Sequence, residues 1–66
     1  MALSDNIRVC RQRAGMSQSH LAKMIGACQS AISRMEQGER TPSVATLSSI
    51  ASALNVDIDT LVHGER

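Results

Sequence analysis

The absence of aromatic residues is the feature that most restricts how this chain can fold. None of its 66 residues is Phe, Trp or Tyr, yet 42% of them are hydrophobic. Ordering each residue costs about 1.5 kcal/mol, and burial of apolar surface recovers about 25 cal/mol per Å². That burial must come from Leu, Ile, Val, Met and Ala, and close packing of short helices achieves it most efficiently. A core this small also leaves little room for a deep enzymatic pocket.

The composition excludes several other classes of protein. The apolar content is too high for a disordered chain, and no run of about 18 apolar residues is present to span a membrane. The two cysteines could form at most one bridge, so this is not a disulfide-stapled secreted scaffold. Met1 to Ser4 lead into a charged segment without the basic-then-apolar pattern of a signal peptide. We therefore expect a cytoplasmic protein.

No group of residues indicates an enzyme, a metal site or a cofactor. The serines have no recognisable acid–base partners. His20 and His63 are far apart in the sequence, and no Cys/His spacing matches a zinc site. We expect no catalytic residue, no metal, no cofactor and no small-molecule ligand.

Glycine, proline and capping residues divide the chain into five expected helices. They cover residues 4–14, 18–25, 29–37, 44–54 and 58–63. Strand signals are weak, because period-two runs are short, so the expected fold class is all-α. Residues suited to N-caps open these segments, namely Ser4 or Asp5, Ser17, Ser43 and Asp57.

Apolar residues recur at helical spacing and mark the faces that should form the core. Met16 and Met24 are expected in or near the same core. The positions expected to be buried are Ile7, Cys10, Ala14, Leu21, Ala22, Ile25, Ala27, Ile32, Met35, Val44, Leu47, Ile50, Ala51, Leu54, Ile58, Leu61 and Val62.

The segment from Gln18 to Glu36 has the spacing of a helix-turn-helix. Two helices joined by about three residues cross steeply, so a small side chain is needed where they approach, and Ala22 occupies that place. The turn needs a residue that tolerates positive φ, which Gly26 provides. This combination is far more specific than a single small residue or a single glycine.

With these elements in place, the chain resembles the Cro/repressor-type helix-turn-helix domains of phage and bacterial transcription regulators. The resemblance covers nearly the whole chain and implies one DNA-binding domain over residues 1–66, a compact five-helix bundle of the lambda repressor-like kind. It implies a third helix that enters the major groove of a palindromic operator as part of a homodimer. The matching positions are Ile7, Arg8, Arg11, residues 15–18, Leu21, Ala22, Gly26, Gln29, Ser30, residues 32–34, Glu36, Gly38, Pro42, Ser43, Leu47, Ile50, Ala51, Leu54 and Leu61.

The same resemblance assigns roles to particular residues. Gln18, Arg40 and Thr41 match positions that touch phosphate, whereas Gln29, Ser30, Arg34 and, more weakly, Ser33 match positions that reach base edges. Glutamine can pair with adenine and arginine with guanine. Cys28 precedes the recognition helix where the family usually has Ser or Thr, and a thiol is a poor cap. The predicted DNA-binding set is thus Gln18, Cys28, Gln29, Ser30, Ser33, Arg34, Arg40 and Thr41.

The sequence also predicts a structural ion pair and a dimer interface. Arg11 and Glu36 match a structural ion pair of the family. Val56, Ile58, Leu61 and Val62 exceed what a short terminal helix can bury against so small a core, so we expect a dimer interface there. The alternative is that all four close the core of the single chain.

Two questions stay open at this level. An antitoxin-like or adaptor module could use the same fold to bind a protein partner, because a fold does not by itself define function. Cys28 is either an inert small residue or a thiol whose oxidation would block DNA binding.

Overall fold

The computed structural model describes residues 2–64 of the chain. Within this range the chain forms five α-helices and no strand. None of these helices is both long and apolar enough to span a bilayer. The predicted all-α, five-helix fold is therefore confirmed. The helices are α1 Leu3–Arg13, α2 Gln18–Ile25, α3 Gln29–Glu36, α4 Val44–Leu54 and α5 Ile58–His63.

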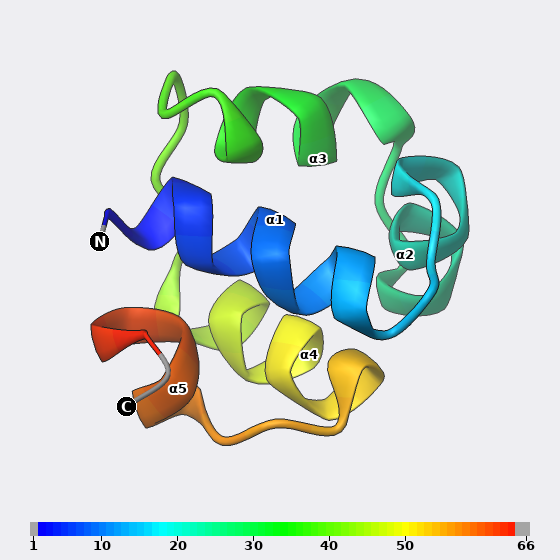
Figure 1. Cartoon of the computed structure of the whole chain (residues 1–66). Helices are drawn as coiled ribbons and strands as arrows, with labels where there is room; N and C mark the ends of the chain where they lie inside the picture. Colours follow the sequence, from blue (N-terminus) through cyan, green and yellow to red (C-terminus); the bar gives the residue numbers. More distant parts are fainter. Residues whose placement is uncertain (1, 65–66) are drawn as a thin grey trace.

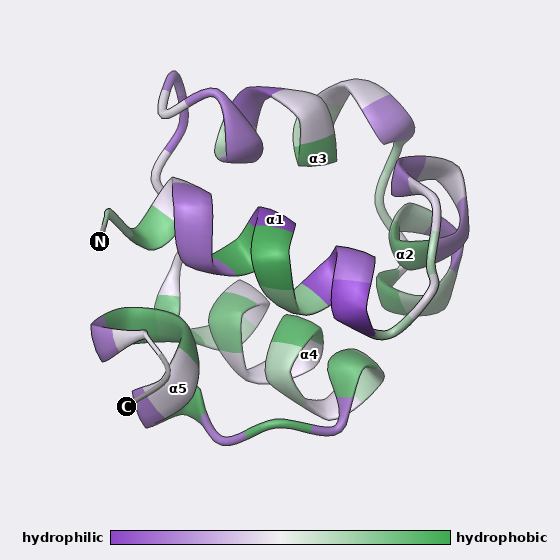
Figure 2. Ribbon diagram, in the orientation of Figure 1, coloured by the Kyte–Doolittle hydropathy of each residue, from purple (hydrophilic) through white to green (hydrophobic). Residues whose placement is uncertain are grey.

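Helix α1 runs through the middle of the molecule (Figure 1). Helix α3 lies on one side of it, α4 and α5 lie on the other side, and α2 closes one end. The apolar faces of the helices turn toward the space between them (Figure 2). Each helix contributes one completely buried aliphatic side chain to this core, and these are Ile7, Leu21, Ile32, Ile50 and Leu61.

Local signals place the helix ends. Ser17 and Ser43 are N-caps whose side chains accept hydrogen bonds from the backbone N–H groups of His20 and Thr46. Gly26 ends α2 in the left-handed conformation, with φ +72°. A Cβ on Gly26 would meet no atom within 4 Å. The glycine is therefore required for its backbone conformation and not for close packing.

Two of the predicted N-caps and the limits of two helices are wrong in detail. Helix α1 covers Leu3–Arg13 where residues 4–14 were expected. The N-cap of α1 is Ala2, with no side-chain hydrogen bond, so neither Ser4 nor Asp5 caps this helix. Asp57 occupies the N-cap position of α5 as predicted, but its side chain makes no capping bond. Helix α3 ends at Glu36, one residue earlier than expected, with Gln37 as its C-cap.

Five residues predicted for the core lie at the surface, and two of them are Ile58 and Val62 of α5, which are 38% and 41% exposed. Val44 is 78% exposed, because it is the first residue of α4 and projects beyond the edge of the core. Ala14 is exposed because it follows the last turn of α1. Met24 is 50% exposed, since Leu21 and Ala22 occupy the inward face of α2.

An ion pair between α1 and α3 joins the two sides of the domain. Arg11 Nε donates to Glu36 Oε2 over 2.6 Å, and Arg11 Nη2 donates to Glu36 Oε1 over 3.0 Å. The Arg11 and Glu36 side chains are only 11% and 3% exposed. Hydrogen bonding to Glu36 raises the pKa of the Arg11 guanidinium above its usual value. The predicted ion pair is thus present and largely buried.

We expect Glu36→Gln to lower the free energy of unfolding by about 3 kcal/mol, because it leaves the Arg11 charge partly buried without a counterion. Urea unfolding followed by far-UV circular dichroism measures this loss. Asp5→Asn is the matched control. It breaks the exposed Arg8–Asp5 pair and should cost less than about 0.5 kcal/mol. Equal losses in the two variants would contradict the structural role of the buried pair.

The N-cap of α3 provides a second test. Cys28 makes no side-chain capping bond, unlike Ser17 and Ser43. We expect Cys28→Ser to raise the melting temperature by roughly 4 °C, because a hydroxyl can accept a bond from the free N–H groups of the first turn. Ser17→Ala should lower it by a similar amount. An unchanged or lower melting temperature for Cys28→Ser would show that the cap is not limiting.

Candidate nucleic-acid interface

Helices α2 and α3 form a helix-turn-helix. Their turn consists of residues 26–28, and it begins at the left-handed Gly26. The N–H of Ala27 donates to the carbonyl of Ala22 over 2.8 Å. Ala22 itself is 3% exposed. A larger side chain would have no room there, which is the role expected for this position.

Helix α3 has one buried and one exposed face. Its buried residues are Ala31, Ile32, Met35 and Glu36. Gln29, Ser30 and Arg34 are exposed, and Ser33 is partly exposed. The predicted base-reading residues therefore share the outer face of the helix.

Gln37 is a further polar residue of this face, and it was absent from the predicted DNA-binding set. It lies seven residues after Ser30, and its Nε2 donates to Ser33 Oγ over 3.0 Å. The signal was available, because residues at i, i+3, i+4 and i+7 share one side of a helix. Gln37 thus extends the polar stripe formed by Ser30, Ser33 and Arg34.

A hydrogen-bonded series leads from the buried ion pair to the exposed face. Gln18 Nε2 donates to Glu36 Oε1 over 3.2 Å. Gln29 Nε2 approaches Gln18 Oε1 at 3.5 Å, and Ser19 Oγ donates to Gln29 Oε1 over 3.1 Å. Each amide has two donors and two acceptor lone pairs. Gln18 and Gln29 are therefore held in place but keep capacity for other partners.

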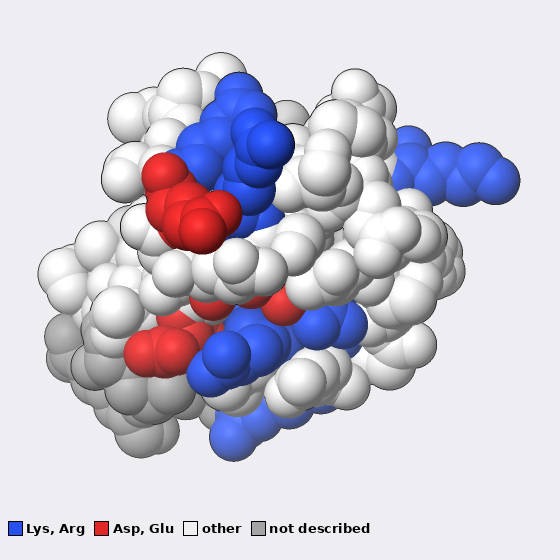
Figure 3. All heavy atoms as spheres, turned by 90° about the horizontal axis from the view of Figure 1, so that it is seen from above, with Lys and Arg blue, Asp and Glu red and all other residues white. Residues whose placement is uncertain are grey.

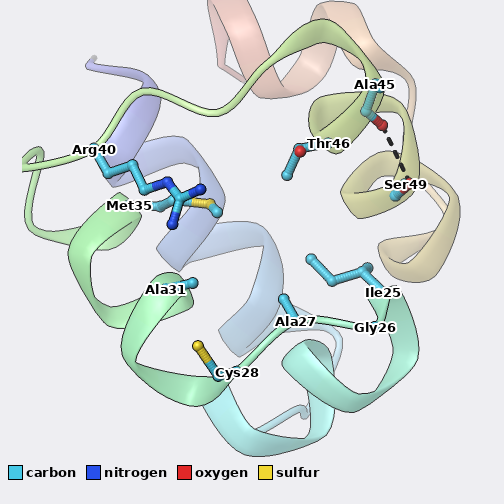
Figure 4. A pocket seen from close by; sticks show the side chains of 10 residues that line it. All are labelled: Ile25, Gly26, Ala27, Cys28, Ala31, Met35, Arg40, Ala45, Thr46 and Ser49. Carbon is cyan, nitrogen blue, oxygen red and sulfur yellow. Dashed lines mark hydrogen bonds between the residues drawn. The ribbon is translucent and has the colours of Figure 1, made fainter.

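Arg40 lies on the flank of α3 that faces α4. It lines a pocket of about 380 Å³ with Cys28, Met35 and Thr46. Figure 4 shows its side chain extended across Met35, with Thr46 of α4 on the opposite wall. Thr41 follows in the same loop and is exposed. The two predicted phosphate contacts of this loop are therefore accessible beside α3.

Cys28 is exposed at the start of α3. Its Sγ lies 3.2 Å from Ser30 Oγ. Hydrogen bonding from the Ser30 hydroxyl, with smaller effects of the Ala31 backbone and Arg40, places the pKa of the thiol below its usual value. The thiol is thus next to the predicted base-reading residue Ser30.

The positive groups on the face that carries α3 are spread over several places. Figure 3 views this face from the α3 side of Figure 1, and it shows Lys and Arg side chains at separate places, some of them beside Asp or Glu side chains, with uncharged surface between. The net charge of the chain is only +1, so the distribution of the charges matters more than their sum.

Within residues 2–64, no group of three or more His, Cys, Asp or Glu is placed to hold a metal ion.

The four predicted dimer residues differ in how far they are exposed. Leu61 is 0% exposed and belongs to the core of the single chain, so its prediction as a dimer contact is wrong. A short helix still needs one anchor in the core, and Leu61 is that anchor for α5. Val56 is partly buried against the core. Ile58 and Val62 are 38% and 41% exposed and remain available for a partner.

Comparisons with known proteins agree with this geometry. The family model described as "Helix-turn-helix" matches residues 7–61. SutR, an HTH-type transcriptional regulator of Escherichia coli, is 38% identical over 91% of this chain. YqaE, an uncharacterized HTH-type transcriptional regulator of Bacillus subtilis, is 34% identical over 94% of this chain. The chain spans 34% of the length of SutR and 53% of that of YqaE.

A solved structure is similar over almost its full length. The P22 c2 repressor, crystallised with a synthetic operator, has 31% sequence identity and a TM-score of 0.90, covering 98% of each chain. The family comprises transcriptional regulators and not enzymes. From the family match over residues 7–61, the helix-turn-helix geometry and these relatives, we conclude that the chain belongs to the Cro/C1-type helix-turn-helix family of transcriptional regulators.

Proposed function

We propose that this protein binds an operator in double-stranded DNA as a homodimer and regulates transcription from it in the cytoplasm. The observation that carries the proposal is the exposed stripe of Gln29, Ser30, Ser33 and Arg34 on the second helix of a helix-turn-helix. An α-helix fits the major groove, and these side chains can form hydrogen bonds with base edges. Similarity to the P22 c2 repressor, which was crystallised with an operator, supports this reading.

Contacts to phosphate would set the register of α3 in the groove. Gln18 lies at the start of α2, where free backbone N–H groups favour an anion. Arg40 lies on the other flank of α3, next to α4, and the exposed Thr41 follows it in the loop. The carboxylate of Glu36 is close to this surface, but its pairing with Arg11 neutralises the charge that would repel DNA. Contacts on both flanks would fix the helix without reading sequence.

Self-association would involve the exposed side of α5. Ile58 and Val62 are four residues apart on this helix and are both more than one-third exposed. Residues at this spacing share one face, and a two-fold axis brings the same face of each copy together. Two recognition helices would then read half-sites about 34 Å apart.

Selection of bound sites from random double-stranded DNA, at a stated salt concentration, tests this proposal. We expect a palindromic consensus, and an affinity that falls steeply with salt, with a slope in log–log form of about −0.9 per phosphate contacted. Failure to enrich any site would refute DNA-binding regulation. If the chain instead co-purified with one protein partner and had no salt-dependent DNA affinity, an antitoxin-like or adaptor module would be the better description.

Base-reading and phosphate contacts should respond differently to mutation. Arg34→Ala should relax the preference at one base pair and cost about 1–3 kcal/mol on the selected site. Arg40→Ala should weaken all sequences similarly and reduce the salt slope by about 1. Binding titrations on the selected site and on single-base variants measure both effects. Arg8→Ala is the control, because Arg8 lies on α1 and pairs with Asp5. Uniform weakening by Arg34→Ala would contradict its base-reading role.

A further inference from the structure

Asn6 is a buried polar residue that the proposed DNA interface does not use. Its side chain is in the first half of α1, and the residue is 3% exposed. Nδ2 donates to the carbonyl of Leu61 in α5 over 2.9 Å, across 55 positions of the sequence. A buried amide without a partner destabilises a fold. The bond therefore ties α1 to α5 and satisfies the amide at the same time.

The acceptor is one of the carbonyls that a helix end leaves free. The last four carbonyls of an α-helix have no partner within the helix, and Leu61 is in the last turn of α5. The neighbouring carbonyl of Thr60 accepts from the N–H of Gly64 over 2.9 Å. Asn6 thus acts as a cap for α5 that is supplied by another helix.

Helix α5 depends on such contacts because it is short. It has six residues, and its N-cap Asp57 makes no side-chain capping bond. Isolated helices of fewer than about 12 residues are marginal in water. The position of α5 is therefore set by the buried Leu61 side chain and by the bond from Asn6 to the Leu61 carbonyl.

The backbone of Gly64, just after α5, lies close to the side-chain amide of Asn6. Gly64 has φ +82°, and a Cβ at this position would lie 3.2 Å from Asn6 Oδ1. Any other residue would be strained there and would press on the amide. Gly64 and Asn6 therefore form a matched pair at the end of α5.

Helix α1 carries two buried polar ties that lead to opposite sides of the domain. Asn6 holds α5, and Arg11 holds α3 through Glu36. The two residues are five positions apart, or about 7.5 Å along a helix. Helix α1 thus connects the helix that would read DNA to the helix that exposes Ile58 and Val62.

We propose that Asn6 positions the self-association face of α5 relative to α3, and so sets the half-site spacing that two copies read. This inference rests on the proposed dimeric function. Asn6 is buried and belongs neither to the predicted DNA-binding set nor to the exposed residues of α5. Its effect is on the angle and distance between the two recognition helices of a dimer.

Sedimentation equilibrium of the whole chain provides the first test. Asn6→Ala should raise the dimer dissociation constant by about tenfold, which corresponds to the loss of one buried hydrogen bond. Gly64→Ala should act in the same direction, because it displaces the end of α5 while keeping the amide. Circular dichroism confirms that each variant is folded at the temperature used. If Asn6→Ala does not fold, the result for Gly64→Ala decides.

Operator spacing provides a readout that a purely structural role would not change. The palindromic site recovered by selection is lengthened or shortened between its half-sites by single base pairs. We expect the wild-type chain to bind one spacing much more tightly than the others. In Asn6→Ala the ratio of affinities for the preferred and the altered spacing should fall about tenfold, while the base preference within each half-site stays unchanged. Ile32→Val is the matched control. It removes a buried methylene on α3 and should destabilise the fold without altering the spacing preference.

The outcomes separate this inference from the function on which it rests. A wild-type chain that stays monomeric, both free and on the selected site, would overturn the dimeric part of the proposed function. A wild-type dimer whose dissociation constant and spacing preference are the same in Asn6→Ala and Gly64→Ala would overturn the role of Asn6 alone. Equal loss of spacing preference in Ile32→Val would also overturn it, because general destabilisation would then explain the effect.

Discussion

The side chains of Arg11 and Glu36 lie between the core and the surface that we propose faces DNA. The bidentate pair joins α1 to α3, and a third nitrogen of Arg11 donates to the carbonyl of Met16 just before α2. A buried ion pair gives little net stability, but losing one partner is costly. Its main effect here is to hold both helices of the helix-turn-helix against α1. It also allows a carboxylate to orient Gln18 near phosphate without a net negative charge.

Helix α1 therefore has two structural contacts, of which only the pair of Arg11 with Glu36 was predicted from the sequence. Its polar residues Arg11 and Asn6 form buried bonds to α3 and α5, on opposite sides of the molecule. The apolar core between them is held by aliphatic packing, which has no preferred direction. Such packing alone tolerates small rotations of the helices. Two polar ties on one rigid helix remove that freedom. In a domain without aromatic residues, orientation thus depends on a few hydrogen bonds while stability depends on Leu, Ile, Met and Ala.

The fold class could be predicted from the sequence. The limits of the helices could also be predicted, to within two residues. Caps such as Ser17 and a left-handed glycine such as Gly26 act within one turn of chain, so no knowledge of the rest of the molecule was needed. The misplaced core residues Val44 and Ala14 lie at helix ends, where helical spacing cannot tell whether the core extends that far. The lack of aromatic residues also argues against a base-stacking platform for single strands.

The sequence by itself determined the five helices, the helix-turn-helix and the polar face of α3, because each of these follows from periodicity and capping over a few residues. Only the tertiary structure decided which apolar residues of α5 are free: Leu61 enters the core, whereas Ile58 and Val62 remain exposed. It also decided that Asn6 is buried and bonded to α5. Both outcomes depend on which surfaces meet across 55 residues of chain, and local sequence pattern contains no information about that contact.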